Sequence, residues 1–135
     1  MFSGTIITEW LDNGRDMRIV KEVKYIDPYG IEWIAPVDAI INGASIPQPL
    51  WSAVGSPFVG KYRRASVFHD VACTEQTRPS MQVHKMFYNA MIEDGVEPEK
   101  AESFYSIVVL FGPRWGDTDW DQFNLYPFDL SGDIE

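Results

Sequence analysis

Apolar and polar positions alternate in the first part of the chain, which is the pattern of strands with one buried face. The alternation is clearest in residues 17–26, where apolar side chains recur two and four residues apart. Two turn sequences bound this segment, Asp-Asn-Gly at 12–14 and Asp-Pro-Tyr-Gly at 27–30. We therefore predict a small antiparallel β-meander with strands over residues 5–11, 17–26 and 31–37.

Beyond residue 46 the apolar positions recur three and four residues apart, which is typical of helices with one buried face. Ser45 precedes the first of these segments and is expected to be its N-cap, and Ser80 is expected to cap the third. The last segment is the most apolar, so we place the centre of the helical core there. The pattern predicts helices over residues 47–54, 61–74, 80–95 and 98–111.

Length and composition fit a single folded domain. The chain has 135 residues, of which 45% are hydrophobic and 14% aromatic, and this size can bury a continuous core. The predicted class is α+β: a small N-terminal antiparallel β-meander packed on three to four helices, followed by an irregular, acidic and aromatic tail. We expect one domain over residues 1–115 and the tail over residues 116–135.

The charge of the chain excludes several classes of partner. The formal net charge is −9, and nucleic-acid affinity depends largely on Lys and Arg that neutralise phosphates, so we expect no nucleic-acid partner. No run approaches the ~20 apolar residues of a membrane span, and the N-terminus does not resemble a signal peptide. The single cysteine, Cys73, excludes an intrachain disulfide.

Candidate chemistry concentrates in two of the predicted helices. Both histidines of the chain lie there, His69 next to Asp70 in one helix and His84 in the next. As metal ligands, these three side chains would suit Zn or another divalent metal with a bound water as nucleophile. In the metal-free alternative, His69 is a general base oriented by a carboxylate or by the second imidazole.

Plainer explanations compete at each of these positions. A histidine beside an apolar stripe is commonly a hydrogen-bonded core residue. Ser45 as a nucleophile is less favoured than Ser45 as a helix cap, and Cys73 fits a small buried apolar side chain better than a reactive thiol. The sequence has no His-Glu-x-x-His motif, no Gly-x-Ser-x-Gly elbow and no Walker phosphate loop.

Several short motifs occur in a characteristic order: Asn-Gly-Ala-Ser-Ile-Pro at 42–47, Gly-Ser-Pro at 55–57, Gly-Lys-Tyr at 60–62 and His-Asp at 69–70. With the helix that carries Phe87 and Met91, and the helix that ends in Phe-Gly at 111–112, they resemble a family of domains of unknown function common in bacteriophages and prophages. The resemblance covers about residues 17–115. It implies a β-hairpin-plus-helices domain and a phage setting.

The chain departs from the family pattern at three positions. Asn42 stands where the family usually has Asp, His84 stands where a helical Asp is usual, and Cys73 stands where an aromatic residue is usual. The His-Asp pair also resembles the catalytic helix of small phospholipases A2, in which the histidine is the base and the aspartate helps bind calcium. Under the metal hypothesis, His84 replaces a carboxylate as a ligand.

These considerations leave two expected functions. The first is a structural or interaction protein of a phage particle, in the tail or baseplate, located in the virion or the host cytoplasm. It would bind phage structural proteins through the tail aromatics Trp115, Trp120, Phe123, Tyr126 and Phe128. The second is a small metal- or histidine-dependent hydrolase that acts on the bacterial cell envelope through His69, Asp70 and His84. The three departures favour the first.

Overall fold

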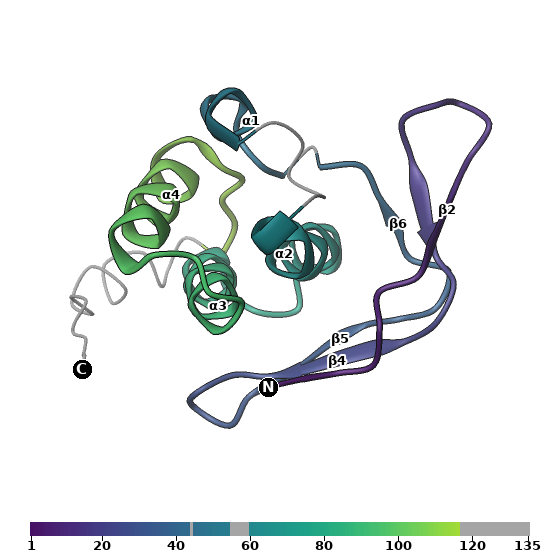
Figure 1. Cartoon of the computed structure of the whole chain (residues 1–135), viewed down its shortest axis with the longest axis horizontal. Helices are drawn as coiled ribbons and strands as arrows, with labels where there is room; N and C mark the ends of the chain where they lie inside the picture. The colour runs from purple at the N-terminus through teal and green to yellow at the C-terminus, as the bar shows by residue number, and fades with distance from the viewer. Residues whose placement is uncertain (44, 55–59, 117–135) are drawn as a thin grey trace.

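A computed structural model of the chain describes residues 1–43, 45–54 and 60–116. These residues form an α+β fold of short strands followed by helices, as the sequence predicts (Figure 1). The strands are β1 (Phe2–Ser3), β2 (Thr8–Trp10), β3 (Met17–Ile19), β4 (Val23–Ile26), β5 (Glu32–Ala35) and β6 (Ile40–Ile41). The helices are α1 (Gln48–Val54), the 3₁₀ turn η1 (Gly60–Tyr62), α2 (Arg63–Glu75), α3 (Ser80–Glu93) and α4 (Pro98–Phe111).

The strands form two small antiparallel sheets instead of one meander. Their orders are β1-β4-β5 and β2-β3-β6. The single strand predicted over residues 17–26 is therefore wrong, because β3 and β4 belong to different sheets. The chain bends at Lys21. In a continuous strand this side chain would point inward, because Ile19 and Val23, two residues before and after it, are both buried. A lysine is costly to bury, so the bend turns this side chain to solvent.

The hairpin between β4 and β5 is organised by one buried carboxylate. Oδ1 of Asp27 accepts hydrogen bonds from the backbone N–H groups of Tyr29 and Ile31. Oδ2 accepts a bond from the indole Nε1 of Trp33 at 3.0 Å. Gly30 takes the left-handed φ of 80° that the turn requires. The carboxylate thereby fixes both the turn and the inward Trp33 ring.

Trp33→Phe tests this network. The substitution keeps most of the buried ring but removes the indole donor, so we expect it to lower the free energy of unfolding by about 1 kcal/mol, the usual net value of one hydrogen bond. Urea unfolding followed by circular dichroism measures the change. Trp10→Phe is the matched control, since Trp10 is 67% exposed and should change stability by less than about 0.5 kcal/mol. Equal effects of the two substitutions would contradict the role of Asp27.

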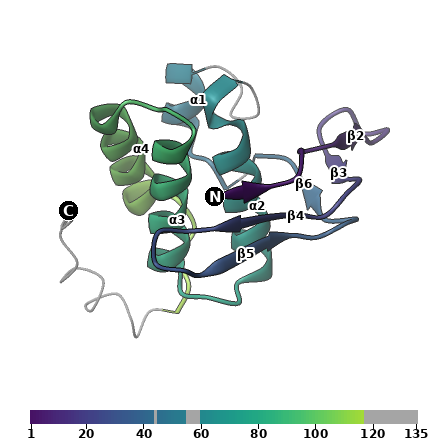
Figure 2. The ribbon, with the colours of Figure 1, turned by 60° about the horizontal axis from the view of Figure 1, so that its bottom comes forward.

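Helix α2 is the centre of the core. Every residue from Ala65 to Cys73 is buried, because α3 packs on one side of this helix and the sheets pack on another (Figures 1 and 2). Phe68 of α2 contacts the ring of Tyr25 in β4 and the ring of Phe2 in β1. The prediction that α4 is the centre is wrong. This helix buries only Ala101, Phe104 and Val108 and leaves much of its apolar surface outside.

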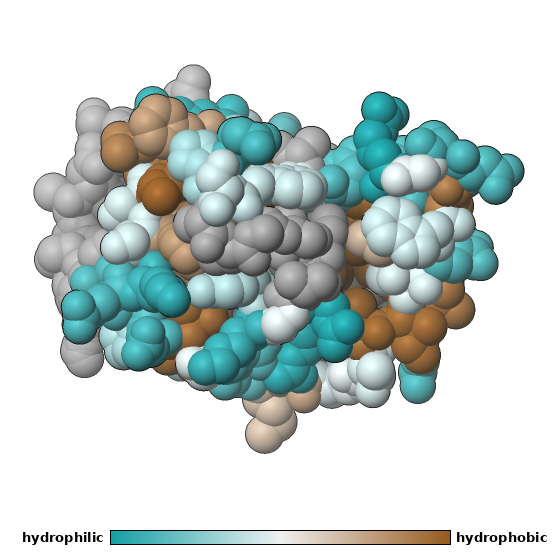
Figure 3. Space-filling model, turned by 45° about the horizontal axis from the view of Figure 1, so that its top comes forward, coloured by the Kyte–Doolittle hydropathy of each residue, from teal (hydrophilic) through white to brown (hydrophobic). Residues whose placement is uncertain are grey.

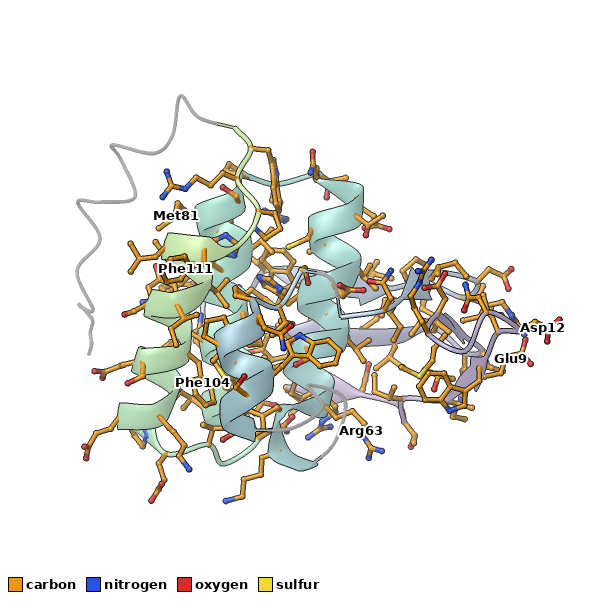
Figure 4. All side chains as sticks on the ribbon, turned by 90° about the horizontal axis from the view of Figure 1, so that it is seen from above. Glu9, Asp12, Arg63, Met81, Phe104 and Phe111 are labelled. Atoms are coloured by element: carbon orange, nitrogen blue, oxygen red, sulfur yellow. The ribbon has the colours of Figure 1, made fainter. Side chains whose placement is uncertain are left out.

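The two sheets differ in how far they are covered. The sheet β1-β4-β5 lies across α2 and α3, whereas β2-β3-β6 extends from the helices as an arm (Figure 2). Glu9 and Asp12 lie at the outer end of this arm, and Phe104 lies among the helices (Figure 4). Apolar surface is visible on the arm beside hydrophilic groups (Figure 3). Apart from Asp27 at the β4–β5 hairpin, the buried polar residues lie in α2, in α3 or in the loop before α1: Ser45, Ser66, His69, Asp70, Ser80 and His84.

The first turn of α3 differs from its prediction. Pro79 occupies the N-cap position and Ser80 is the first helical residue. The hydroxyl of Ser80 donates to the carbonyl oxygen of Trp115 at 3.0 Å instead of capping the helix. The predicted tail beyond residue 116 lies outside the described residues. In the part of the chain that the structure describes, no helix is long and apolar enough to cross a membrane.

Candidate functional site

Asp70 joins the loop before α1 to the central helix. Its Oδ2 accepts a hydrogen bond from the backbone N–H of Asn42 at 2.9 Å. Its Oδ1 accepts one from the Ser45 hydroxyl at 2.8 Å and one from the Ser45 N–H at 3.3 Å. Three donors from the loop thus converge on one buried carboxylate. This arrangement explains why the loop sequence and the His-Asp pair occur together in the chain.

The same loop brings Ser45 to His69. Ser45 Oγ lies 3.1 Å from Nδ1 of His69, and both residues are buried. Helix α1 begins at Gln48, so Ser45 stands two residues before the N-cap position and the predicted capping role is wrong. Its hydroxyl is directed at α2 because Asp70 holds both its backbone and its side chain. A hydroxyl beside an imidazole is the arrangement in which a base can activate an alcohol.

His69 is joined in turn to His84 on α3. Nε2 of His69 lies 2.9 Å from Nδ1 of His84, and Nε2 of His84 lies 3.0 Å from the carbonyl oxygen of Pro113. The two imidazoles therefore meet across the contact between α2 and α3. The resulting series of polar contacts runs from Ser45 through both histidines to the carbonyl of Pro113.

Both histidines are fully buried, and burial governs their protonation. It lowers the pKa of His69 well below its ordinary value, and the nearby His84 lowers it further. Burial also lowers the pKa of His84 to about 4; the bond to the Pro113 carbonyl opposes this shift, while the charge of Arg114 adds to it. The two rings are therefore neutral near pH 7. A neutral imidazole has one N–H and one nitrogen that can accept a proton.

Cys73 lies one helical turn after His69. Its Sγ is 3.7 Å from both ring nitrogens of His69. Burial raises the pKa of the Cys73 thiol to about 12, the charge of Asp70 raises it further, and a hydrogen bond with Ser45 opposes the shift. Since the thiolate is the reactive form, Cys73 is an inert neighbour here. This agrees with its expected role as a small buried side chain.

The three predicted metal ligands do not meet at one point. Asp70 lies on the Nδ1 side of His69, beyond Ser45, while His84 lies on the Nε2 side. The nitrogens that would bind a metal are directed at each other and at a carbonyl. Among the residues with described positions, no group of three or more His, Cys, Asp or Glu side chains could hold a metal ion. The metal site therefore stays a prediction.

At the level of sequence, one participant of this network is set aside and another is missed. Ser45 is weighed there as a nucleophile, but helix capping is preferred, because the sequence does not show that the 42–47 loop contacts the His-Asp pair. The carbonyl of Pro113 carries no sequence signal, because every residue has a carbonyl. Trp115, which was expected to bind a partner, is half-buried against its own chain and donates its indole N–H to the Arg78 carbonyl.

Comparison with known proteins identifies relatives without a described activity. Over 94 residues the chain is 40% identical to the uncharacterized protein y4jT of Sinorhizobium fredii (strain NBRC 101917 / NGR234), a match of 70% of this chain and 28% of that protein. It is also 40% identical over 92 residues to the uncharacterized protein y4iH of the same strain, covering 68% of this chain and 38% of the relative. The chain thus spans well under half of either relative, and no solved structure matches it significantly. Residues 17–108 match the family described as "Protein of unknown function (DUF1353)", and the chain belongs to this family.

Proposed function

We propose that this protein is a histidine-dependent hydrolase in which Ser45 is the nucleophile and His69 is the general base. The contact of 3.1 Å between Ser45 Oγ and Nδ1 of a neutral His69 carries this proposal. The distance is within the range for proton transfer between a hydroxyl and a base. The pairing needs no metal, and the substrate class is an ester or amide with a carbonyl carbon that Ser45 can attack.

The steps follow from the positions of the groups. The Ser45 hydroxyl, which donates to Asp70 in the structure, rotates toward His69. As Ser45 Oγ forms a bond to the carbonyl carbon of the substrate, its proton passes to Nδ1 of His69. The imidazolium then donates this proton to the leaving alcohol or amine as the acyl–oxygen or acyl–nitrogen bond breaks. A water molecule, deprotonated by His69, hydrolyses the acyl-Ser45 ester and regenerates the hydroxyl.

Asp70 has a second task in this scheme. Its carboxylate accepts the Ser45 hydroxyl at 2.8 Å, so its negative charge lies one hydroxyl away from the cationic His69 that forms during the reaction. An opposite charge at that distance stabilises the charged form of an imidazole. Asp70 therefore offsets part of the cost of placing a cation in a buried site.

A fluorophosphonate probe tests the proposal, because such probes form a covalent bond only with activated serine hydroxyls. We expect the probe mass on the peptide that contains Ser45 in the wild-type protein, and none in Ser45→Ala. Ser66→Ala is the matched control, since Ser66 is also buried, in α2, and no hydrogen bond between Ser66 and a histidine is seen among the described residues. In this variant the labelling of Ser45 should equal that of the wild type. A folded wild-type protein whose Ser45 stays unlabelled would contradict the proposal, and the network would then serve packing alone. A panel of ester and amide substrates, including those of the bacterial envelope, then identifies the bond.

A second candidate is an interaction protein of a phage particle. Apolar side chains stay exposed on the β2-β3-β6 arm and beside it, and such surface is typical of contacts between proteins. They are Ile7, Trp10, Val37 and Ile40. If the protein is a virion component, mass spectrometry of purified particles of a phage encoding it will detect it at a fixed ratio to the other structural proteins. Its absence from such particles would exclude this role.

A further inference from the structure

We propose that His84 is a positioning residue: together with the Pro113 carbonyl it fixes the tautomer of His69, so that the proton lies on Nε2 and Nδ1 faces Ser45 as an acceptor. This inference rests on the proposed function for its catalytic meaning, but the tautomer itself can be measured independently. It concerns His84 and the segment after α4, which take no part in the hydrolytic steps proposed for Ser45 and His69.

The direction of the hydrogen bonds follows from the Pro113 end. A carbonyl oxygen only accepts, so the 3.0 Å contact requires a proton on Nε2 of His84. A neutral imidazole has one N–H, which leaves Nδ1 of His84 as an acceptor. The 2.9 Å contact then requires the proton of His69 to lie on Nε2. The remaining nitrogen, Nδ1 of His69, then directs a lone pair at Ser45 Oγ, and the single hydroxyl proton of Ser45 has two acceptors within reach, this nitrogen at 3.1 Å and Oδ1 of Asp70 at 2.8 Å.

The opposite tautomer is disfavoured by the same distances. A proton on Nδ1 of His69 would place two lone pairs against each other at 2.9 Å between the imidazoles. Moving the proton of His84 to its Nδ1 would relieve that contact but would place a lone pair against the Pro113 carbonyl at 3.0 Å. Unpaired polar atoms in buried surroundings are costly. On the Ser45 side, a proton on Nδ1 of His69 would let the Ser45 hydroxyl stay on Asp70. We infer that the contact with the Pro113 carbonyl outweighs this demand and determines which nitrogen of His69 is basic.

This carbonyl is itself held in place. The neighbouring Trp115 donates its indole N–H to the Arg78 carbonyl, and its own carbonyl accepts from the hydroxyl and the N–H of Ser80. The indole also meets the His84 ring edge-on, with ring centroids 6.3 Å apart. These contacts fasten the segment after α4 across the beginning of α3. The acceptor that orients His84 is therefore part of a fixed structure.

Two substitutions of His84 separate its two hydrogen bonds. The amide of His84→Asn reaches the place of Nδ1 and can still accept from His69, whereas the amide of His84→Gln reaches the place of Nε2 and can bond only to Pro113. Long-range ¹H–¹⁵N spectra of the full chain report which nitrogen of His69 carries the proton. We expect Nε2–H in the wild type and in His84→Asn, and a mixture of both tautomers in His84→Gln. Labelling of Ser45 should fall about 100-fold in His84→Gln, which is within the range for loss of general-base catalysis.

Each outcome distinguishes this inference from the proposed function. An Nδ1–H tautomer of His69 in the wild-type protein overturns the inference. This measurement needs no variant, so the inference can be tested even if His84→Gln does not fold. An unchanged tautomer in folded His84→Gln overturns it as well. A tautomer that shifts in His84→Gln while Ser45 stays unlabelled in every protein supports the role of His84 and refutes the hydrolase.

Discussion

Replacing Asp70 with alanine is expected to lower the free energy of unfolding by about 3–5 kcal/mol, a large part of the 5–15 kcal/mol that stabilises a typical domain. The carboxylate accepts three hydrogen bonds from Asn42 and Ser45, and it is 4% exposed. Alanine would leave these donors without their partner in a buried place. Each lost bond to a charged acceptor costs about 1.5 kcal/mol or more.

Urea unfolding at pH 7.5 measures this change. Asp12→Ala is the control, because Asp12 is exposed at the outer end of the arm (Figure 4) and its removal should change stability by less than about 0.5 kcal/mol. The loss in Asp70→Ala should be accompanied by loss of Ser45 labelling, since the loop is no longer directed at His69. A folded Asp70→Ala protein with wild-type stability would show that the loop is held by other contacts.

Mild acid is expected to destabilise the protein by about 4 kcal/mol between pH 7.5 and pH 5, or about 2 kcal/mol for each histidine. Burial lowers the pKa of His84 to about 4 and that of His69 well below its ordinary value. In the unfolded chain both groups titrate near pH 6.5. The unfolded state therefore binds more protons as the pH falls below 6.5, so the stability present above that pH is progressively lost.

This loss of stability can be assigned to the histidines, because the chain has only two of them and carboxylates ordinarily titrate below pH 5. The free energy of unfolding in urea, measured in steps from pH 7.5 to pH 5, gives the slope. His84→Asn has one imidazole fewer and should show about half the loss. If stability stays constant over this range, the histidines are solvated in the folded protein and the neutral, buried pair is refuted.

Sequence patterns located the helices well because each carries an apolar stripe of helical period between clear end signals. The last helix, for example, was expected over residues 98–111 and is α4 (Pro98–Phe111). They located the sheets less well. Strand pairing depends on long-range contacts, and the alternation of Met17, Ile19, Val23 and Tyr25 keeps the same phase through the bend at Lys21. The position of the bend had to come from three-dimensional packing.

The sequence also allows the two histidines to be placed on facing helices, but it does not predict the order of the contacts between them. Helical periodicity fixes which face a side chain occupies, so His69 and His84 could be placed on opposed faces. It does not fix which ring nitrogen meets which atom. That depends on Ser45, held by Asp70, and on the Pro113 carbonyl, held by Trp115.

The contacts of the chain ends bear on how this domain can be excised from longer relatives. The family match covers residues 17–108. Before residue 17, however, Phe2 stacks on Tyr25 and β2 pairs with β3. After residue 108, the Pro113 carbonyl accepts the N–H of His84. A fragment cut at the limits of similarity would thus lose two strands and the last acceptor of the histidine pair. The shortest fragment that retains every described partner of the core runs from about the first residue to Gly116, so boundaries for expression should follow hydrogen bonds instead of sequence similarity.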